Sequence, residues 1–205
     1  QYVNQLQGGQ WQRVADDAAH NTIGRALKGD VLGIWGYGKI GQRLARYAQA
    51  FEMPVLVWGS EASRLAAQRD GHRAAESRQA LFRDADVLSL HLRLVDSTRH
   101  AVTLDDLLWM KPGALLVNTS RAELIAPGAL LTAISQGRPG FAALDVFEDE
   151  PLLDPAHPLL NHPRILCTPH LGYVERQSYE LYFGDAFANL LAYFKGDKCT
   201  LVNVL

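Results

Sequence analysis

Short apolar runs and longer amphipathic segments alternate along this chain. Such runs recur from residue 31 onward at 31–35, 55–58, 87–90, 114–117, 141–144 and 165–167. Runs of this length, apolar on both faces, are typical of strands buried beneath helices on the two sides of a sheet. The pattern therefore predicts strands at these six places.

The segments between the runs carry helical spacing. Ile40, Leu44, Tyr47 and Ala48 lie at i, i+4, i+7 and i+8, which predicts an amphipathic helix with these side chains on one face. Similar stripes occur at 104–108 and 130–134, and a last helix is predicted over 176–194, with a C-terminal stop at 195–196. Strand and helix in alternation predict an α/β fold, a Rossmann-type doubly wound parallel sheet with helices on both faces.

Composition and charge exclude several classes of protein. Of the 205 residues, 48% are hydrophobic and 20% charged, enough to bury a core. The net charge is −2 and no run of like charges occurs, which argues against nucleic-acid and membrane-surface partners. Two cysteines make no disulfide framework, and no apolar stretch approaches the ~18 residues of a membrane-spanning helix. We expect a soluble, cytoplasmic protein.

The two ends of the sequence indicate a piece of a longer protein. The chain starts with Gln1 rather than Met, and residues 1–13 resemble the tail of an amphipathic helix that ends near Gly8–Gly9. Removal of an initiating Met and a tag is the alternative explanation. The apolar tail at 201–205 needs a partner to cover it.

A glycine motif carries the first chemical signal. Residues 36–41 read G-Y-G-K-I-G, directly after the first predicted strand and at the start of the next helix. In this context Gly36 permits a tight turn, Gly38 admits a pyrophosphate, and Gly41 lets the helix approach the strand closely. Free N–H groups at the helix start attract phosphate. A dinucleotide site is predicted, with an ordinary glycine-rich turn as the alternative.

The second strand ends without the carboxylate that commonly binds the ribose hydroxyls of NAD. Gly59 stands at that tip, so a 2′-phosphate meets no repulsion. Ser60, Ser63 and Arg64 could donate hydrogen bonds to it, whereas Glu61 opposes it. This favours NADP over NAD, although Arg64 could equally be a solvated helix residue.

Two further motifs follow strands at the edge where ligands of open sheets bind. Asn-Thr-Ser-Arg at 118–121 offers Arg121 to a substrate carboxylate, or alternatively to a local ion pair with Glu123. Glu150 and His170 end neighbouring strands, and a carboxylate there can hold an imidazole protonated for acid–base chemistry. A metal pair of His157 and His162 lacks a third ligand, so no metal is expected.

In this order, G-x-G-x-x-G, Asn-x-Ser-Arg, Asp-Val-Phe-x-x-Glu-Pro and Thr-Pro-His-x-Gly resemble the D-isomer-specific 2-hydroxyacid dehydrogenases, the family of D-3-phosphoglycerate dehydrogenase and glyoxylate/hydroxypyruvate reductase. The resemblance runs from about Leu27 to the end of the chain. It implies hydride transfer between nicotinamide and a D-2-hydroxy acid or 2-oxo acid. It also implies roles for Arg121 as the substrate-carboxylate arginine, Glu150 as the partner acid and His170 as the acid–base.

The resemblance also implies cofactor contacts. Asp145 would hold the nicotinamide carboxamide. The implied cofactor-binding residues are Gly36, Gly38, Lys39, Ile40, Gly41, Gly59, Ser60, Arg64, Leu92, Arg93, Thr119, Ser120, Arg121, Asp145, His170, Gly172 and Tyr173. Three positions depart from the family pattern, namely Gly59 for Asp, Arg93 for Pro, and Tyr173 where a second Gly is frequent.

Residues 27–195 are predicted to form the NAD(P)-binding domain. Residues 1–26 would lead out of an absent N-terminal substrate domain, and 196–205 would return to it. The resemblance further implies a homodimer through the nucleotide domain. Three alternatives remain: a corepressor-like nucleotide sensor without turnover, a formate dehydrogenase, against which Glu150 argues because Gln is usual there, and a fragment that binds nucleotide only.

Overall fold

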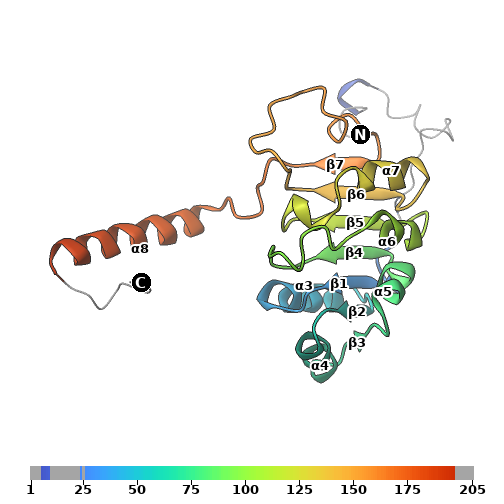
Figure 1. Ribbon diagram of the computed structural model, residues 1–205, viewed down its shortest axis with the longest axis horizontal. Helices are drawn as coiled ribbons and strands as arrows, with labels where there is room; N and C mark the ends of the chain where they lie inside the picture. The colour runs from blue at the N-terminus through green and yellow to red at the C-terminus, as the bar shows by residue number, and fades with distance from the viewer. Residues whose placement is uncertain (1–5, 10–23, 25, 197–205) are drawn as a thin grey trace.

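The protein is described by a computed structural model covering residues 6–9, 24 and 26–196. Seven parallel strands form one sheet in the order β3-β2-β1-β4-β5-β6-β7 (Figure 1). The strands are β1 (Leu32–Trp35), β2 (Val55–Trp58), β3 (Arg73–Ala74), β4 (Val87–Leu90), β5 (Leu115–Asn118), β6 (Phe141–Leu144) and β7 (Ile165–Cys167). The predicted doubly wound parallel sheet is confirmed.

All six strands predicted from apolar runs are present, and the sheet has one more. β3 has only two residues, which pair with Leu56 and Val57 of β2. Its Arg73 is exposed, and a two-residue strand at a sheet edge has no apolar run to reveal it. The strand was therefore not predicted.

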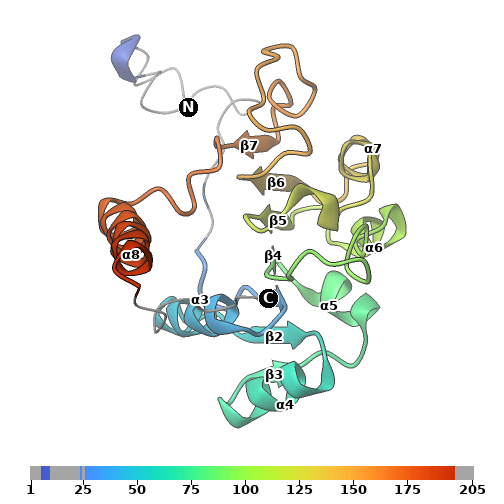
Figure 2. The same cartoon turned by 60° about the vertical axis from the view of Figure 1, so that its left-hand side comes forward.

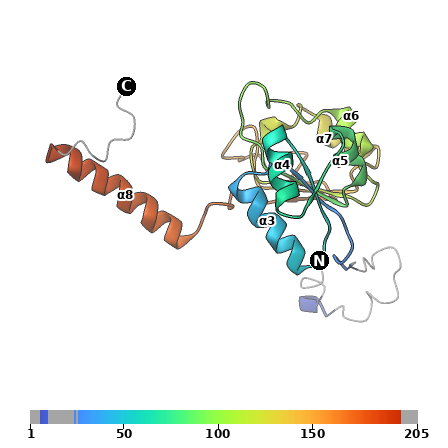
Figure 3. The ribbon, with the colours of Figure 1, turned by 90° about the horizontal axis from the view of Figure 1, so that it is seen from below.

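Helices cover the sheet from two sides. α3 (Lys39–Ala50) and α4 (Glu61–Arg69) pack on one face. α5 (Arg78–Asp84), α6 (Leu104–Trp109) and α7 (Ala129–Ser135) contact one another and lie together on the other side (Figure 3). The core divides accordingly, with a larger cluster that includes Phe82 and Leu107 and a smaller one that includes Ile34 and Ala45.

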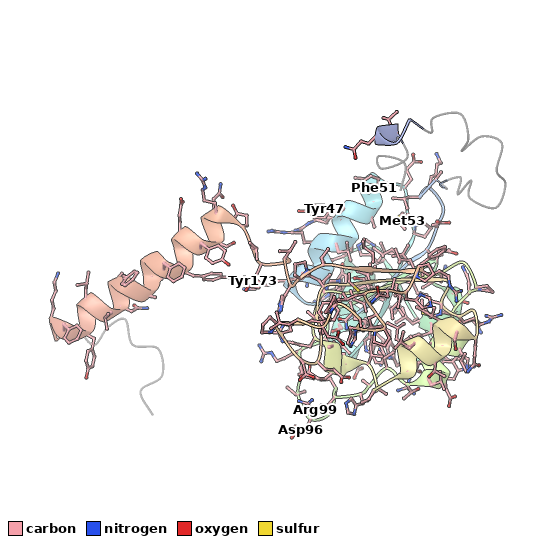
Figure 4. The ribbon with its side chains drawn as sticks, turned by 90° about the horizontal axis from the view of Figure 1, so that it is seen from above. Tyr47, Phe51, Met53, Asp96, Arg99 and Tyr173 are labelled. Carbon is pink, nitrogen blue, oxygen red and sulfur yellow. The ribbon has the colours of Figure 1, made fainter. Side chains whose placement is uncertain are left out.

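The face that α3 buries matches the predicted stripe only in part. Gly41, Ala45 and Ala48 are its buried residues, and of the predicted stripe Ala48 is buried and Leu44 packs against the smaller core cluster. Ile40 is 69% exposed and Tyr47 57% exposed, and Tyr47 lies on the outer side of the helix (Figure 4). Small residues at i, i+4 and i+7 let the helix axis approach the sheet closely, and this pushes the large apolar side chains to its flank. The stripes on α6 and α7 face the core as predicted, through Leu107 and Ile134.

The last helix, α8, spans Arg176–Phe194 as predicted. Glu175 caps its start by accepting hydrogen bonds from the amides of Gln177 and Ser178. Lys195 ends it, followed by Gly196 at φ +81°. α8 extends away from the sheet and buries none of its residues (Figure 1, Figure 2). No helix in the described part of the chain is both long and apolar enough to span a bilayer.

Little of the predicted leading and trailing segments can be compared with the structure. A helical turn at 6–7 ends at Gly8–Gly9, where the Gly9 amide donates to the Leu6 carbonyl at 3.0 Å. The rest of the helix predicted for 1–13 lies outside the described residues, as does the tail at 197–205.

Candidate active site

The predicted site residues lie in loops that leave the carboxyl ends of parallel strands. β1 leads into the glycine loop, β5 into the Asn118–Arg121 turn, β6 into Asp145, and β7 into the turn with His170. Because the strands are parallel members of one sheet, these loops share one edge of it. The fold therefore brings together motifs that lie far apart in the sequence, since Gly36 and His170 are separated by 134 positions.

The glycine loop has the geometry that its three glycines predict. Gly36 adopts φ +102°, and a Cβ on it would lie 2.5 Å from the His91 carbonyl oxygen. A Cβ on Gly41 would overlap the Gly36 carbonyl oxygen. A Cβ on Gly38 would meet nothing within 4 Å, so this backbone faces open space. Gly36 and Gly41 allow the backbone segments around the loop to pack closely, and Gly38 leaves room for a ligand.

This opening fits a dinucleotide pyrophosphate. Gly38 is the N-cap of α3 and provides no side-chain cap, and the first turn of α3 contains no acidic residue. The positive end of the helix dipole and its amide groups therefore face the open space. Lys39 and Ile40 are both exposed in this first turn, as their predicted pyrophosphate contacts require.

Tyr37 connects the glycine loop to α4. Its side chain is buried, and its hydroxyl donates to Asp70 Oδ2 at 2.9 Å. Burial, followed by this hydrogen bond, raises the pKa of Tyr37 to about 12. The loop is thereby tied to the C-terminal end of α4, a contact between positions 33 residues apart that the sequence did not indicate.

The tip of β2 lies beside the glycine loop. A Cβ on Gly59, which has φ +155°, would lie 3.2 Å from Ser63 Cβ and 3.8 Å from Gly36 Cα. Ser60 caps α4 by accepting from the Ser63 amide at 3.2 Å, and the two hydroxyl oxygens are 3.1 Å apart. The Arg64 guanidinium lies over the Trp58 ring, 4.7 Å from its centroid. The two hydroxyls thus lie beside Gly59 at the start of α4, and the guanidinium lies over the last residue of β2.

The loop after β4 forms the opposite wall of the glycine turn. The Leu92 amide nitrogen would be 3.3 Å from a Cβ on Gly36. Arg93 is exposed, and its carbonyl accepts from Thr98 Oγ1 at 2.6 Å. His91 Nε2 lies 2.9 Å from Ser89 Oγ, and burial lowers the pKa of His91. A neutral His91 is therefore part of this wall.

The turn with Arg121 is fixed by Asn118. The buried Asn118 side chain donates to the Arg121 carbonyl at 2.8 Å and accepts from the Ser120 amide at 3.1 Å. The Ser120 hydroxyl donates to the Leu90 carbonyl at 2.6 Å, and Thr119 is exposed. Glu123 makes an ion pair with Arg99 at 3.8 Å, so the alternative pairing of Arg121 with Glu123 is not what the structure has. Arg121 is exposed, and its charge acts on Glu150.

Glu150 and His170 form a close pair. Glu150 Oε2 lies 2.6 Å from His170 Nδ1, and Glu150 Oε1 accepts from the Phe147 amide at 2.9 Å. The hydrogen bond with His170, then the Phe147 amide, lower the pKa of Glu150, so it is a carboxylate at neutral pH. A carboxylate only accepts, so Nδ1 carries the proton and Nε2 is left for a substrate.

Asp145 holds the turn that carries His170. Its Oδ1 accepts from Thr168 Oγ1 at 2.5 Å and from the Leu171 amide at 2.8 Å, and its Oδ2 accepts from the Gly172 amide at 2.7 Å. Although burial raises the pKa of Asp145, these hydrogen bonds lower it below its usual value overall. The sequence missed this positioning role and the part of Thr168 in it.

Tyr173 packs edge-on against His170, with ring centroids 5.2 Å apart and planes at 88°. Tyr173 lies between α8 and the rest of the chain (Figure 4). Beyond it, the rings of Tyr179 and Phe183 continue the contact along α8. The residue that replaces the usual glycine therefore supplies an aromatic wall to the candidate acid–base.

The other histidines that the sequence drew attention to have local roles. His157 Nδ1 accepts from the Leu159 amide at 3.3 Å, and His162 Nδ1 accepts from the Arg164 amide at 3.2 Å. In the described part of the chain, His, Cys, Asp and Glu side chains form no group of three or more that could hold a metal ion.

Comparison with known proteins finds a matching family model and similar reductases. Residues 1–172 match the family model described as "D-isomer specific 2-hydroxyacid dehydrogenase, NAD binding domain". The chain is 37% identical over 174 residues to a glyoxylate reductase of Aeropyrum pernix, covering 85% of this chain and 51% of that protein. It is 38% identical over 170 residues to 4-methyl-2-oxopentanoate reductase A of Aspergillus oryzae, covering 83% of this chain and 49% of that protein.

Solved structures agree in fold. A phosphoglycerate oxidoreductase from Vibrio cholerae superposes with a TM-score of 0.87 at 52% identity, over 95% of this chain and 61% of that chain. An oxidoreductase from Ralstonia solanacearum gives a TM-score of 0.91 at 53% identity, over 99% of this chain and 60% of that chain. The chain thus spans about half the length of the curated relatives given above. The resemblance seen in the ordered motifs is confirmed: the chain belongs to the D-isomer-specific 2-hydroxyacid dehydrogenase family and matches its NAD-binding domain.

Proposed function

We propose that the protein is an NAD(P)-dependent dehydrogenase that interconverts a D-2-hydroxy acid and its 2-oxo acid. The observation that carries the proposal is the 2.6 Å pair of Glu150 and His170 at the same sheet edge as the dinucleotide loop. The names of relatives, such as glyoxylate reductase and hydroxypyruvate reductase, support small 2-oxo acids as the substrate class.

Each residue of the site has one task in this reaction. The nicotinamide, when bound, supplies or takes up the hydride at the substrate's C2. The Arg121 guanidinium binds the substrate carboxylate with two parallel hydrogen bonds and thereby orients the carbonyl. His170 Nε2 donates a proton to the oxygen as it becomes an alkoxide, and in the oxidative direction it accepts that proton. Glu150 stabilises the imidazolium, and Asp145 keeps the turn in place.

The proposal is tested by following NADPH and NADH absorbance with glyoxylate and hydroxypyruvate. The assay is run on this chain and on the chain joined to an upstream substrate domain. We expect turnover that His170→Ala abolishes while nucleotide affinity stays nearly unchanged. A large loss of nucleotide affinity in His170→Ala contradicts the acid–base assignment. Nucleotide binding without turnover in both forms would instead favour a sensor related to the corepressors.

For the cofactor we propose a preference for NADP over NAD. Support comes from Gly59, which leaves no carboxylate at the tip of β2, and from the hydroxyls and guanidinium of Ser60, Ser63 and Arg64 beside it. Gly59→Asp is expected to shift the ratio of affinities toward NADH. Because a side chain at φ +155° and 3.2 Å from Ser63 Cβ is strained, Ser60→Asp serves as a second variant. An unchanged affinity ratio in both variants refutes the proposal.

We further propose that residues 27–195 are the nucleotide-binding domain, joined through 1–26 and 196–205 to a substrate domain, and that the protein is a homodimer. The family resemblance supports a dimer, as do the exposed apolar side chains of Tyr47 on α3 and of Phe51 at its C-terminal end (Figure 4). Light scattering after size exclusion tests the dimer. Tyr47→Glu with Phe51→Glu should yield a monomer, and an unchanged mass contradicts this interface. The cytoplasmic location stays a prediction.

A further inference from the structure

Trp58 is the last residue of β2 and lies beside the glycine loop. It is in register with Trp35 of β1, and its carbonyl accepts from the Gly36 amide at 2.9 Å. Its side chain is half-buried and packs against the larger core cluster. The indole ring is therefore a fixed platform at the edge where the dinucleotide site lies.

The Arg64 side chain packs on this ring. Its guanidinium carbon lies 4.7 Å from the centroid of the Trp58 ring, within the range of a cation–π contact. Without the Trp58 ring, an arginine at the end of the first turn of a surface helix would sample many rotamers and lose that freedom on binding a ligand. The ring holds the guanidinium before any ligand arrives, so this loss of freedom is smaller at the moment of binding.

The Arg64 guanidinium lies in the same short stretch of chain as the hydroxyls of Ser60 and Ser63. The Arg64 amide donates to the Ser60 carbonyl at 3.0 Å, which places Arg64 one turn after Ser60. Ser60 and Ser63 have their hydroxyl oxygens 3.1 Å apart at the start of α4. Gly59, directly before them, brings this stretch close to the dinucleotide loop, since a Cβ on it would lie 3.8 Å from Gly36 Cα. Glu61 is the acidic residue of this first turn, and it opposes an anion.

We propose that Trp58 is a positioning residue that holds the Arg64 guanidinium at the ribose edge, and that it thereby strengthens selectivity for a 2′-phosphorylated dinucleotide. This inference rests on the proposed preference for NADP. A guanidinium binds a phosphate bidentately, so fixing its orientation affects the 2′-phosphate and not the rest of the nucleotide. A cation–π contact at a partly exposed site corresponds to about a two- to fivefold change in affinity.

The test compares two probes that differ by one phosphate, 2′,5′-ADP and 5′-AMP, by titration calorimetry. Their affinity ratio is measured for the wild type, Trp58→Leu, Arg64→Gln and the double variant. We expect Trp58→Leu to reduce the preference for 2′,5′-ADP about threefold. In the Arg64→Gln background the same change should leave the ratio unaffected. Trp58→Phe, which keeps an aromatic face, should retain most of the preference.

The outcomes separate the possible failures. If Trp58 only supports the fold or packs against the adenine, Trp58→Leu weakens the binding of both probes equally and leaves their affinity ratio unchanged. That result overturns the inference. A change in ratio that persists in the Arg64→Gln background also overturns the inference, because Trp58 would then act without Arg64. A wild type that binds both probes equally refutes the NADP preference itself, and the inference with it. Urea unfolding of each variant checks that the fold is retained.

Discussion

Asp145→Asn tests the positioning of the candidate acid–base turn. The carboxylate accepts three hydrogen bonds, of which two come from the amides of Leu171 and Gly172. An asparagine has one acceptor oxygen, and its NH2 group would face one of those amides. Losing one charge-assisted hydrogen bond costs about 1.5–3 kcal/mol.

That loss is measurable as faster exchange of the amide proton that the NH2 group faces. At pH 7 this amide, of Leu171 or of Gly172, should exchange about 10- to 100-fold faster in the variant than in the wild type, because each 1.4 kcal/mol corresponds to about tenfold. Hydrogen exchange followed by NMR resolves both. Asp96→Asn, which alters an exposed carboxylate in the loop after β4, is the matched control and should change neither amide (Figure 4).

The effect should depend on pH with a defined sign. The pKa of Asp145 is lowered in the folded protein, so its stabilisation is complete above its usual pKa and is lost as the pH falls through the lowered value. The difference between wild type and Asp145→Asn should therefore begin to close below about pH 4. Unchanged exchange at pH 7, or a difference that persists undiminished into acid, would refute this account of the turn.

Three more predictions follow from the site. Glu150→Gln should reduce kcat of the active enzyme by about 10²- to 10⁴-fold with little change in nucleotide affinity; a wild-type kcat would show that the pair is not used. Gly36→Ala should lower the free energy of unfolding in urea, because Gly36 has a φ of +102° and a Cβ on it clashes with the His91 carbonyl. Gly38→Ala should retain the stability of the wild type and lose nucleotide affinity. Equal effects of the two variants would contradict their separate roles. Tyr37→Phe should cost about 1 kcal/mol at pH 7. Because the pKa of Tyr37 is raised to about 12, the wild type should lose its advantage as the pH rises from about 10 toward 12, and an advantage maintained there would argue against the hydrogen bond to Asp70.

Local pattern alone determined the strands, the last helix and the dinucleotide loop. A buried parallel strand needs a continuous apolar run, and a phosphate-binding turn needs glycines at fixed spacing, so both leave a mark in the sequence. β3 left none, since two residues at an edge need no apolar run. The buried face of α3 was predicted only in part: Ala48 is buried, but close helix–sheet packing selects Gly41 and Ala45 over Ile40 and Tyr47.

The chemistry of the site depends on distances that only the tertiary structure supplies. The sequence named Arg121, Glu150 and His170 as candidates, but not that Glu150 lies 2.6 Å from His170. It also did not reveal that Asp145 holds the turn, that Tyr37 reaches Asp70, or that Arg64 lies on Trp58. These contacts join residues of different segments of the chain, most of them in loops that follow strands. Their geometry follows from strand order and helix packing, and the residue pattern within any one segment does not encode it.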